Sequence, residues 1–353
     1  MRIPKKLFYM SLSILIFSFC SAKLVNTFTP NTLRDLANEV EIEIGTAFDG
    51  YQIYNTKWKE VVVREFNLGV IHWGVYWSSI EPSQGTFDFA IPDLQVRFCR
   101  ENGLEIRGHP LVFPSSAPEW LTHGEFTSEE LNNILRIHIS QVINHFKGYI
   151  KQWVVVNEPY LYPYRVDDIY YEHFGYDYIE YAFQIARDTD PSIELIYNDV
   201  NNHYSDSETT MLTKEIIQKL KSKNLIDGVG LQMHLDGDNL PDKLDVITTM
   251  KSYGIPVYIT EFDVDLRNIP GSVEDRFLLQ AEIYKSMLEA CLESGVCESF
   301  TVWGIGDKYS WLEQSSINEM SSCKADPTPF DDDLQPKPAY YSLYEALEKY
   351  AKN

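Results

Sequence analysis

The sequence is poor in positive charge. Among its 353 residues, 30 lysines and arginines stand against 52 aspartates and glutamates, which gives a formal net charge of −22 at pH 7. A surface of this sign repels phosphate backbones and anionic lipid headgroups, so neither nucleic acid nor a membrane is an expected partner. A neutral ligand such as a sugar meets no such repulsion.

Nucleotide and zinc signatures are missing as well. Neither G-x-G-x-x-G nor G-x-x-x-x-G-K-[ST] occurs, and there is no H-E-x-x-H motif and no Cys/His cluster. We therefore expect no cofactor and no metal. The acidic run Asp331 to Asp333 suggests calcium as an alternative, but a solvated acidic loop is the favoured interpretation.

Only the amino terminus has a long apolar run. A positively charged start precedes Leu7 to Phe19, whose 13 residues are too few to span a bilayer comfortably. Small residues follow, so residues 1–22 are predicted to be a secretion signal that is cleaved after Ala22. A lipoprotein signal at Cys20 is the weaker alternative, because a bulky phenylalanine precedes it. We expect a secreted, extracellular protein.

Cysteine is scarce, with five residues in the whole chain. Cys20 falls in the predicted signal. Cys291 and Cys297 are six positions apart at a predicted helix end and could form a local disulfide in an oxidising compartment. We expect Cys99 and Cys323 to be free, although the sequence alone leaves the pairing open.

The remaining chain alternates β-rich and helical runs. With 44% hydrophobic and 23% charged residues, it is neither a disordered nor a coiled-coil sequence. Eight strand candidates are continuous apolar runs, as expected for strands buried on both faces. These candidates are 43–48, 67–72, 104–109, 152–157, 194–199, 228–233, 256–262 and 299–304. Helical patterns between and after them include 128–146, 207–223, 273–293 and 339–351.

Eight successive strand-helix units predict an α/β fold, namely a single (β/α)₈ TIM barrel over residues 23–353. A doubly wound open sheet is the main alternative, but no glycine-rich phosphate loop follows the first strand. In such barrels the active site lies at the carboxyl ends of the strands. Polar groups collect at these ends, at His72, His109, Asn157, Glu158, Asn198, Asp199, Gln232, His234, Glu261, Asp263 and Trp303.

Two of these residues form the strongest catalytic candidate. Glu158 follows the fourth strand and Glu261 closes the apolar run of the seventh, so the two can face each other across the barrel mouth. Cleavage of an acetal with retention needs two carboxyls about 5–5.5 Å apart, one as acid and one as nucleophile. The alternative for either residue is a structural ion pair.

The motifs around this pair resemble glycoside hydrolase family 10, the retaining endo-β-1,4-xylanases. The similarity covers nearly all of the chain after the signal. It rests on GTAFD (45–49), EPSQGTFDF (81–89), RGHPLVF (107–113), WVVVNEP (153–159), LIYNDVN (195–201), GVGLQMH (228–234), YITEFD (258–263), FTVWGIGDKYSW (300–311) and PKPAY (336–340). The spacing in ACLESGVC also resembles a disulfide seen in many members.

The resemblance implies a role for each matching residue. Glu158 would be the acid/base and Glu261 the nucleophile, while Asn157 would bind the sugar 2-OH. His234 would hydrogen-bond Glu261 and would itself be held by Asp263. The other implied site residues are His109 at the −1 sugar, Gln232 near the acid/base, Trp303 and Trp311 as aromatic walls, and Asn198 in support.

The resemblance fails on the glycone side, which precedes the cleaved bond. Where the family carries Glu-Asn-x-x-Lys after the second strand, this chain has His72, Trp73 and Tyr76 at the three named positions. Its other departures are Phe113, Pro114 and Ser116 after the third strand and Val200 after the fifth. These changes remove charge and add aromatic bulk, so we expect weak cleavage of plain linear xylan.

Three functions remain open at this stage. The first is a secreted retaining endo-β-1,4-xylanase whose partner is a polysaccharide, xylan or a related β-glycan, and which acts as a monomer. The second is a related retaining β-glycosidase with altered glycone specificity. The third is a non-catalytic carbohydrate-binding barrel, which is disfavoured because Glu158 and Glu261 both remain.

Overall fold

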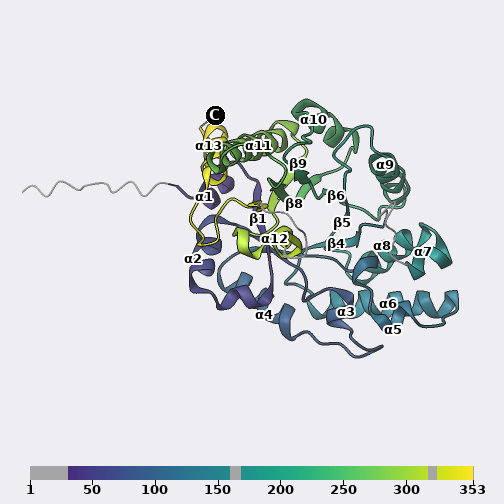
Figure 1. Cartoon of the computed structure of the whole chain (residues 1–353). Helices are drawn as coiled ribbons and strands as arrows, with labels where there is room; N and C mark the ends of the chain where they lie inside the picture. Colours follow the sequence, from purple (N-terminus) through teal and green to yellow (C-terminus); the bar gives the residue numbers. More distant parts are fainter. Residues whose placement is uncertain (1–30, 160–167, 317–323, 353) are drawn as a thin grey trace, which may run out of the picture. The chain divides into compact units, whose positions relative to one another are not determined.

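The computed structural model describes residues 31–159, 168–316 and 324–352. Its centre is a closed barrel of eight parallel strands (Figure 1). These strands are β1 (Glu43–Phe48), β2 (Leu68–Ile71), β3 (Glu105–Gly108), β4 (Gln152–Asn157), β5 (Glu194–Asp199), β6 (Gly228–Leu231), β8 (Val257–Asp265) and β9 (Cys297–Val302). Pairing of β6 with β8 and of β9 with β1 closes the ring, which confirms the predicted (β/α)₈ barrel.

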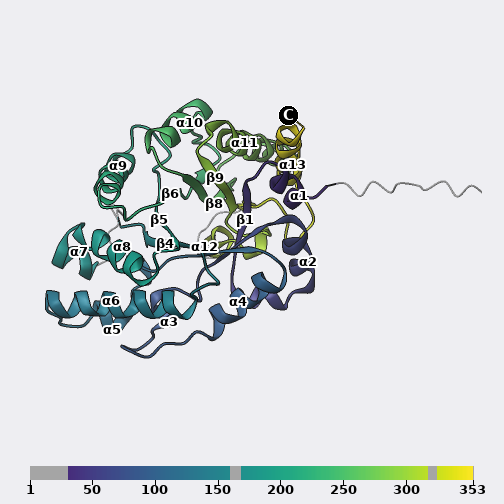
Figure 2. The same ribbon diagram turned by 180° about the vertical axis from the view of Figure 1, so that it is seen from behind.

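Helices surround the barrel, as Figure 2 shows from behind. The α-helices are α1 (Leu33–Glu39), α2 (Thr56–Glu65), α3 (Trp77–Ile80), α4 (Ala90–Glu101), α5 (Glu119–Thr122), α6 (Ser128–His145), α7 (Ile169–Phe174), α8 (Asp177–Thr189), α9 (Glu208–Lys221), α10 (Lys243–Ser252), α11 (Val273–Ser294), α12 (Trp311–Ser316) and α13 (Pro338–Ala351). Short 3₁₀ turns are η1 (Gly50–Tyr54), η2 (Pro114–Ser116) and η3 (Asp307–Tyr309).

Helix boundaries follow capping chemistry. The predicted helix over 128–146 begins at Ser128, but its N-cap is the preceding Thr127, whose side chain accepts from the Glu130 amide. The Glu130 carboxylate in turn accepts from the backbone N–H of Thr127, which completes a capping box. The last helix, α13, packs beside both α1 and α11 (Figures 1 and 2).

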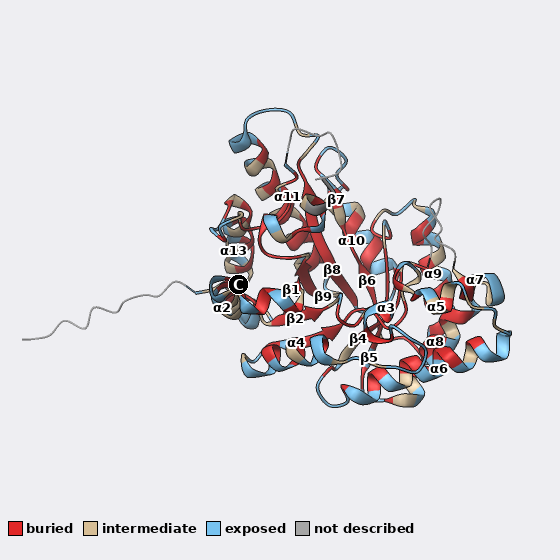
Figure 3. Cartoon of the chain, turned by 60° about the horizontal axis from the view of Figure 1, so that its bottom comes forward, coloured by how far each residue is buried: buried red, intermediate tan, exposed pale blue. Residues whose placement is uncertain are grey.

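Burial explains the continuous apolar runs of the strands. Figure 3 shows buried residues along the strands and on the inward sides of the helices, with exposed residues outside. Close strand packing also constrains side-chain size. A Cβ at Gly108 on β3 would lie 2.3 Å from the Trp153 ring on β4, so only glycine fits there.

The amino-terminal end of the barrel is filled by one buried cation. Arg107 on β3 is fully buried, and its guanidinium donates to Glu43 (2.9 Å), Gln152 (3.0 Å) and Ser299 (3.0 Å). These partners come from three other strands. A planar guanidinium can donate to several acceptors at once, which favours arginine at this position. The polar groups discussed below lie at the opposite, carboxyl end.

Five of the eight strands, β2, β3, β6, β8 and β9, have other bounds than predicted, and two of these differences bear on the barrel mouth. The predicted strand 228–233 is broken at Met233, which has φ = +55°, and the chain resumes as β7 (His234–Asp236), paired only with β8. Strand β8 runs on to Asp265, so Glu261 lies inside the strand rather than at its end. Both differences extend the sheet on the side of the barrel mouth.

The structure tests part of the cysteine prediction. Cys291 and Cys297 form the local disulfide, with their Cα atoms 5.1 Å apart, and this link joins the end of α11 to the start of β9. Cys99 is buried and free. Cys20 and Cys323 lie outside the described residues, as does the predicted signal over residues 1–22. Among the residues that the structure describes, no helix is long and apolar enough to cross a membrane.

Candidate active site at the carboxyl end of the barrel

All ten predicted site residues come together at the barrel mouth. Asn157 and Glu158 come from the end of β4, Asn198 from β5, and Gln232 from the residues just after β6. The rest come from β7, β8, α12 and the residues directly after β3 and β9: His234, Glu261, Asp263, Trp311, His109 and Trp303. Each of the ten touches another member of the set through a hydrogen bond, a close ion pair or a ring contact, as described below.

A chain of side-chain amides joins the two glutamates. Gln232 Nε2 donates to Glu158 Oε1 (2.7 Å) and approaches Asn157 Oδ1 at 3.3 Å. Asn198 Nδ2 donates both to Asn157 Oδ1 (2.7 Å) and to Glu261 Oε1 (2.6 Å). The two carboxylates are therefore fixed within one buried network, and the positions of three amides depend on each other.

The Glu261 carboxylate has a second support from His234. His234 Nε2 lies 3.3 Å from Glu261 Oε2, and its Nδ1 lies 2.8 Å from Asp263 Oδ1. Burial alone would lower the pKa of His234, but the charges of Asp263 and Glu261 raise it to about 10. The ring is then an imidazolium at neutral pH, and both of its N–H groups donate to carboxylates.

The two glutamates have opposite pKa shifts. Burial, followed by the charge of Glu261, raises the pKa of Glu158 to about 7. Burial would also raise the pKa of Glu261, but His109, His234 and the Asn198 amide outweigh it and hold that pKa below its usual value. In weakly acidic solution Glu158 carries a proton while Glu261 is ionised, which is the division needed for an acid and a nucleophile.

Three aromatic rings frame this pair. The His109 ring stands edge-on to Trp303 at 5.3 Å, and its Nε2 lies 3.6 Å from Glu261 Oε1, beyond hydrogen-bond length. Burial lowers the pKa of His109 to about 4, so it is neutral at pH 7. Trp311 packs edge-on to His234 at 5.1 Å and donates from Nε1 to Asp263 (2.9 Å).

Three of the eight non-glycine residues with positive φ in the described part of the chain lie beside the site. Glu158 has φ = +48°, Met233 has φ = +55° and Trp73 has φ = +51°, in the left-handed region that non-glycine residues rarely adopt. The N–H of Glu158 is nevertheless paired, since it donates to the Asn198 carbonyl at 3.0 Å. Such conformations persist where surrounding contacts over-determine them, and they are most frequent at functional sites.

Sequence reasoning missed two contributors. Thr260 donates from its hydroxyl to Asn198 Oδ1 (2.7 Å), which orients the amide so that its NH₂ group faces Glu261. Asp49, in the loop after β1, places Oδ1 3.3 Å from His72 Nε2. Thr260 directly precedes Glu261, and this position could have indicated a role for it. In a regular strand, however, neighbouring side chains point to opposite faces, so Thr260 would point away from the site. The pairing of β8 with β9 is irregular between Ile259 and Phe262, and this relaxes the alternation.

Metal ligands are not grouped in the described part of the chain. There, no cluster of three or more His, Cys, Asp or Glu side chains could hold an ion. In the acidic run, Asp331 accepts from the backbone amides of Asp333 and Gln335, both near 2.9 Å. The Asp332 carboxylate pairs with Lys324. These carboxylates therefore serve a turn and a surface ion pair.

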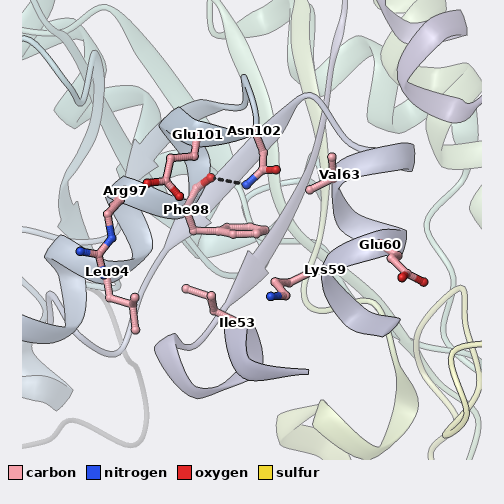
Figure 4. A pocket seen from close by; sticks show the side chains of 9 residues that line it. All are labelled: Ile53, Lys59, Glu60, Val63, Leu94, Arg97, Phe98, Glu101 and Asn102. Atoms are coloured by element: carbon pink, nitrogen blue, oxygen red, sulfur yellow. Dashed lines mark hydrogen bonds between the residues drawn. The ribbon is translucent and has the colours of Figure 1, made fainter. Parts of the chain in front are cut away.

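The pocket drawn in Figure 4 is separate from the site. It measures about 480 Å³ and lies between η1, α2 and α4, on the outer layer of helices. Its walls combine apolar side chains such as Ile53 and Phe98 with Lys59, Arg97 and Glu101. It includes none of the ten site residues, so size alone does not locate the chemistry.

Comparisons with known proteins agree with this geometry. The model of the family "Glycosyl hydrolase family 10" matches residues 32–346. Endo-1,4-beta-xylanase B of Thermotoga neapolitana is 34% identical over 331 residues, which cover 91% of this chain and 92% of that protein.

Solved structures show the same similarity. Native xylanase 10B from Thermotoga maritima superposes with a TM-score of 0.83 at 33% identity, covering 91% of this chain and 99% of that one. Xylanase 10B from Thermotoga petrophila RKU-1, solved with xylobiose, gives the same TM-score and identity over 91% and 98% of the two chains. With its family match over nearly the full length and its two glutamates on adjoining parts of one network, this chain belongs to glycosyl hydrolase family 10.

Proposed function

We propose that this protein is a retaining endo-β-1,4-xylanase that cleaves internal bonds of xylan. The observation that carries the proposal is the amide network that joins Glu158 to Glu261 at the barrel mouth. Burial and neighbouring charges shift the two pKa values in opposite directions, which suits an acid and a nucleophile. The names of the relatives support the substrate class, since several are endo-1,4-beta-xylanases and one similar structure holds xylobiose.

The reaction proceeds in two displacements. Glu261 attacks the anomeric carbon while Glu158 gives its proton to the departing glycosidic oxygen, which yields a covalent glycosyl-enzyme. Glu158, now a carboxylate, takes a proton from water as that water attacks the same carbon and releases Glu261. Two inversions give a product with the β configuration of the substrate.

The other site residues bind and orient the sugar. Asn157 Oδ1 is engaged by Asn198, and its NH₂ group, which also contacts Glu158, donates to the sugar 2-OH. His109 hydrogen-bonds the −1 sugar, while Trp303 and Trp311 wall that subsite with aromatic faces. Gln232 positions Glu158, Asn198 positions Glu261, and Asp263 holds His234.

Product analysis tests the activity. The protein is incubated with xylan, mixed-linkage glucan and aryl β-glycosides, and early ¹H NMR spectra report the anomeric configuration of the first products. We expect β-configured xylo-oligosaccharides of several lengths from xylan. α-Configured first products would contradict the double displacement, and no product from any substrate would favour the non-catalytic barrel.

A related β-glycosidase with altered glycone specificity is the second candidate. It is favoured by the aromatic side chains His72, Trp73 and Tyr76 after β2, which stand where the family pattern has polar residues. Preferential release of products from the mixed-linkage glucan or from one aryl glycoside would select this function over the first.

Secretion and assembly state belong to the same proposal. We propose that residues 1–22 are removed and that the enzyme acts outside the cell as a monomer spanning residues 23–353. The Cys291–Cys297 disulfide supports an oxidising compartment. Amino-terminal sequencing of protein from the culture medium should start at Lys23, and light scattering should give one chain. Intact Met1, or protein confined to the cell, would contradict the signal.

A further inference from the structure

The glycone side of the mouth carries a cluster of four rings that the reaction does not use. His72, Trp73 and Tyr76 come from the loop between β2 and α3, and Phe113 follows β3. Ring centroids lie 5.9 Å apart for Trp73 and Tyr76, 5.9 Å for Tyr76 and Phe113, and 6.1 Å for His72 and Tyr76. We call these four residues the aromatic wall.

The wall adjoins the reacting groups through His72. The His72 ring lies 4.8 Å from that of Trp303, which in turn contacts His109 and His234. Trp73, at the outer end of the wall, is 62% exposed and has a face available for a ligand. The wall therefore extends from the position of the −1 sugar toward solvent.

Tyr76 is the wall member whose hydroxyl is affected by the charges of both catalytic glutamates. Burial, and then the charges of Glu261 and Glu158, raise the pKa of its hydroxyl far above its usual value. The group is therefore a neutral O–H donor at any working pH. Among the described residues its hydroxyl makes no hydrogen bond, so this O–H group is available to a sugar that lies against the wall.

A small pocket of about 70 Å³ opens beside the wall. Its lining includes Asp49, Gln52, His72, Trp73, Trp303 and Trp311, and no lysine or arginine is part of it. One polar atom of this lining, His72 Nδ1, is buried without a hydrogen-bond partner among the described residues, whereas Asp49 Oδ1 faces His72 Nε2 at 3.3 Å. The Ser116 hydroxyl donates to the Phe113 carbonyl within its own turn, so it provides no donor to a ligand.

The charged groups near the wall are the carboxylates of Asp49, Glu261 and Glu158. The nearby His234 imidazolium is already paired with Glu261 and Asp263. Burial lowers the pKa of His72, so His72 is neutral at pH 7 and does not offset them. A neutral sugar hydroxyl fits this environment, and a second negative charge does not.

We propose that the aromatic wall determines glycone specificity and selects uncharged sugars over sugars that carry a carboxylate. In this arrangement the Tyr76 hydroxyl donates to a sugar hydroxyl, and the face of Trp73 stacks on a sugar ring. The pocket lining has no lysine or arginine to pair with the carboxylate of a uronic acid branch. The inference rests on the proposed glycosidase function, because it concerns the same cleft.

One matched pair of substrates tests the charge selection. Xylo-oligosaccharides of one length carry a single glucuronosyl branch on the glycone side, either as the free acid or as its neutral methyl ester. We expect kcat/KM for the ester to exceed that for the acid by about tenfold or more, with cleavage positions mapped by mass spectrometry. Equal values for acid and ester overturn the proposal, whereas a lack of cleavage of any oligosaccharide overturns the glycosidase function instead.

Variants locate the effect in the wall. Tyr76→Phe removes one hydrogen bond and should lower kcat/KM for the ester roughly 2- to 12-fold. Tyr76→Lys adds a cation and should shrink the ester-to-acid ratio.

Trp73→Ala, at an exposed position, should fold normally and raise KM more than it changes kcat. Tyr350→Phe, whose hydroxyl pairs with Glu293 on the outer helices, is the matched control and should leave every ratio unchanged. An unaltered ratio in a folded Tyr76→Lys protein also contradicts the proposal.

Discussion

The two sides of the cleft are built from opposite kinds of side chain. On the reacting side, Asn198 is held at both ends by Thr260 and Glu261, and His234 is held between Glu261 and Asp263. On the glycone side, no hydrogen bond holds the Tyr76 hydroxyl among the described residues, and Nδ1 of His72 is buried there without a partner. The groups that carry out the reaction are fixed by hydrogen bonds within the protein. The groups that recognise the sugar form their hydrogen bonds only with the bound substrate.

This difference assigns catalysis to one side of the cleft and substrate selection to the other. A pre-paired network fixes protonation states before substrate arrives, so changes there should act on kcat for every substrate. An unpaired wall gains its partners only from the bound sugar, so changes there should depend on which sugar is offered. The following predictions, ordered from the largest expected effect to the smallest, test whether the division holds.

Glu261→Ala should abolish turnover of all substrates. Without its carboxylate no covalent intermediate forms, and loss of a nucleophile in covalent enzymes costs on the order of 10⁶-fold in kcat. Azide should restore cleavage of an activated aryl glycoside by entering the vacated space, and NMR should identify an α-glycosyl azide. Glu180→Ala, which removes an acidic surface residue paired with lysines, is the control. Substantial turnover by Glu261→Ala without azide would remove Glu261 from this role.

The sequence predicted this residue, and it did so for physical reasons. Strands buried on both faces are visible as unbroken apolar runs, and eight of them with helices between define a barrel whose working end is known. Glu158 and Glu261 were predicted because they stand at the carboxyl ends of two such runs, in the motifs WVVVNEP and YITEFD that resemble the family.

Other features could not be obtained from the chain alone. The break at Met233 depends on a backbone conformation that an apolar run does not reveal. The pairing of Asp49 with His72 joins two loops, and its partners are set by the closure of the barrel. The direction of the amide chain depends on Thr260, which looks like an ordinary strand residue.

Glu158→Ala should separate substrates by leaving group. General acid catalysis is worth roughly 10²- to 10⁴-fold, so cleavage of xylan should fall by that factor. An aryl glycoside with a good leaving group needs no proton for the first step, and its intermediate should accumulate as a burst in stopped-flow traces. Equal losses on xylan and on the aryl substrate, with no burst, would show that Glu158 is not the acid.

The pH dependence should report the paired network. Glu158 must be protonated to act as acid, and its pKa is raised to about 7, so kcat/KM on xylan should fall about tenfold per pH unit above that value. Glu261 must be ionised, and its pKa is held below the usual value, so the acidic limb should appear only below about pH 4.5.

The alkaline limb is the sharper half of this test. Glu158→Gln, assayed with an activated aryl glycoside, should lose that limb while keeping the acidic one. If xylan cleavage by the unaltered enzyme already declines from pH 5, Glu158 has an ordinary pKa. Burial and the charge of Glu261 would then not raise it.

Phe113→Ala should give the smallest change and bears most directly on the comparison. Phe113 meets Tyr76 edge to face with centroids 5.9 Å apart, and such a pair contributes about 0.5–1.5 kcal/mol beyond its buried area. Loss of this support lets Tyr76 move, so KM for xylo-oligosaccharides should rise roughly 2- to 12-fold, while kcat and both pH limbs stay in place. Phe126→Ala removes a similar edge-to-face partner of Trp120 and serves as the control, since Phe126 contacts no wall residue. A fall in kcat with unchanged KM would mean that the wall also orients the reacting groups, and the division between a chemical side and a selecting side would then be wrong.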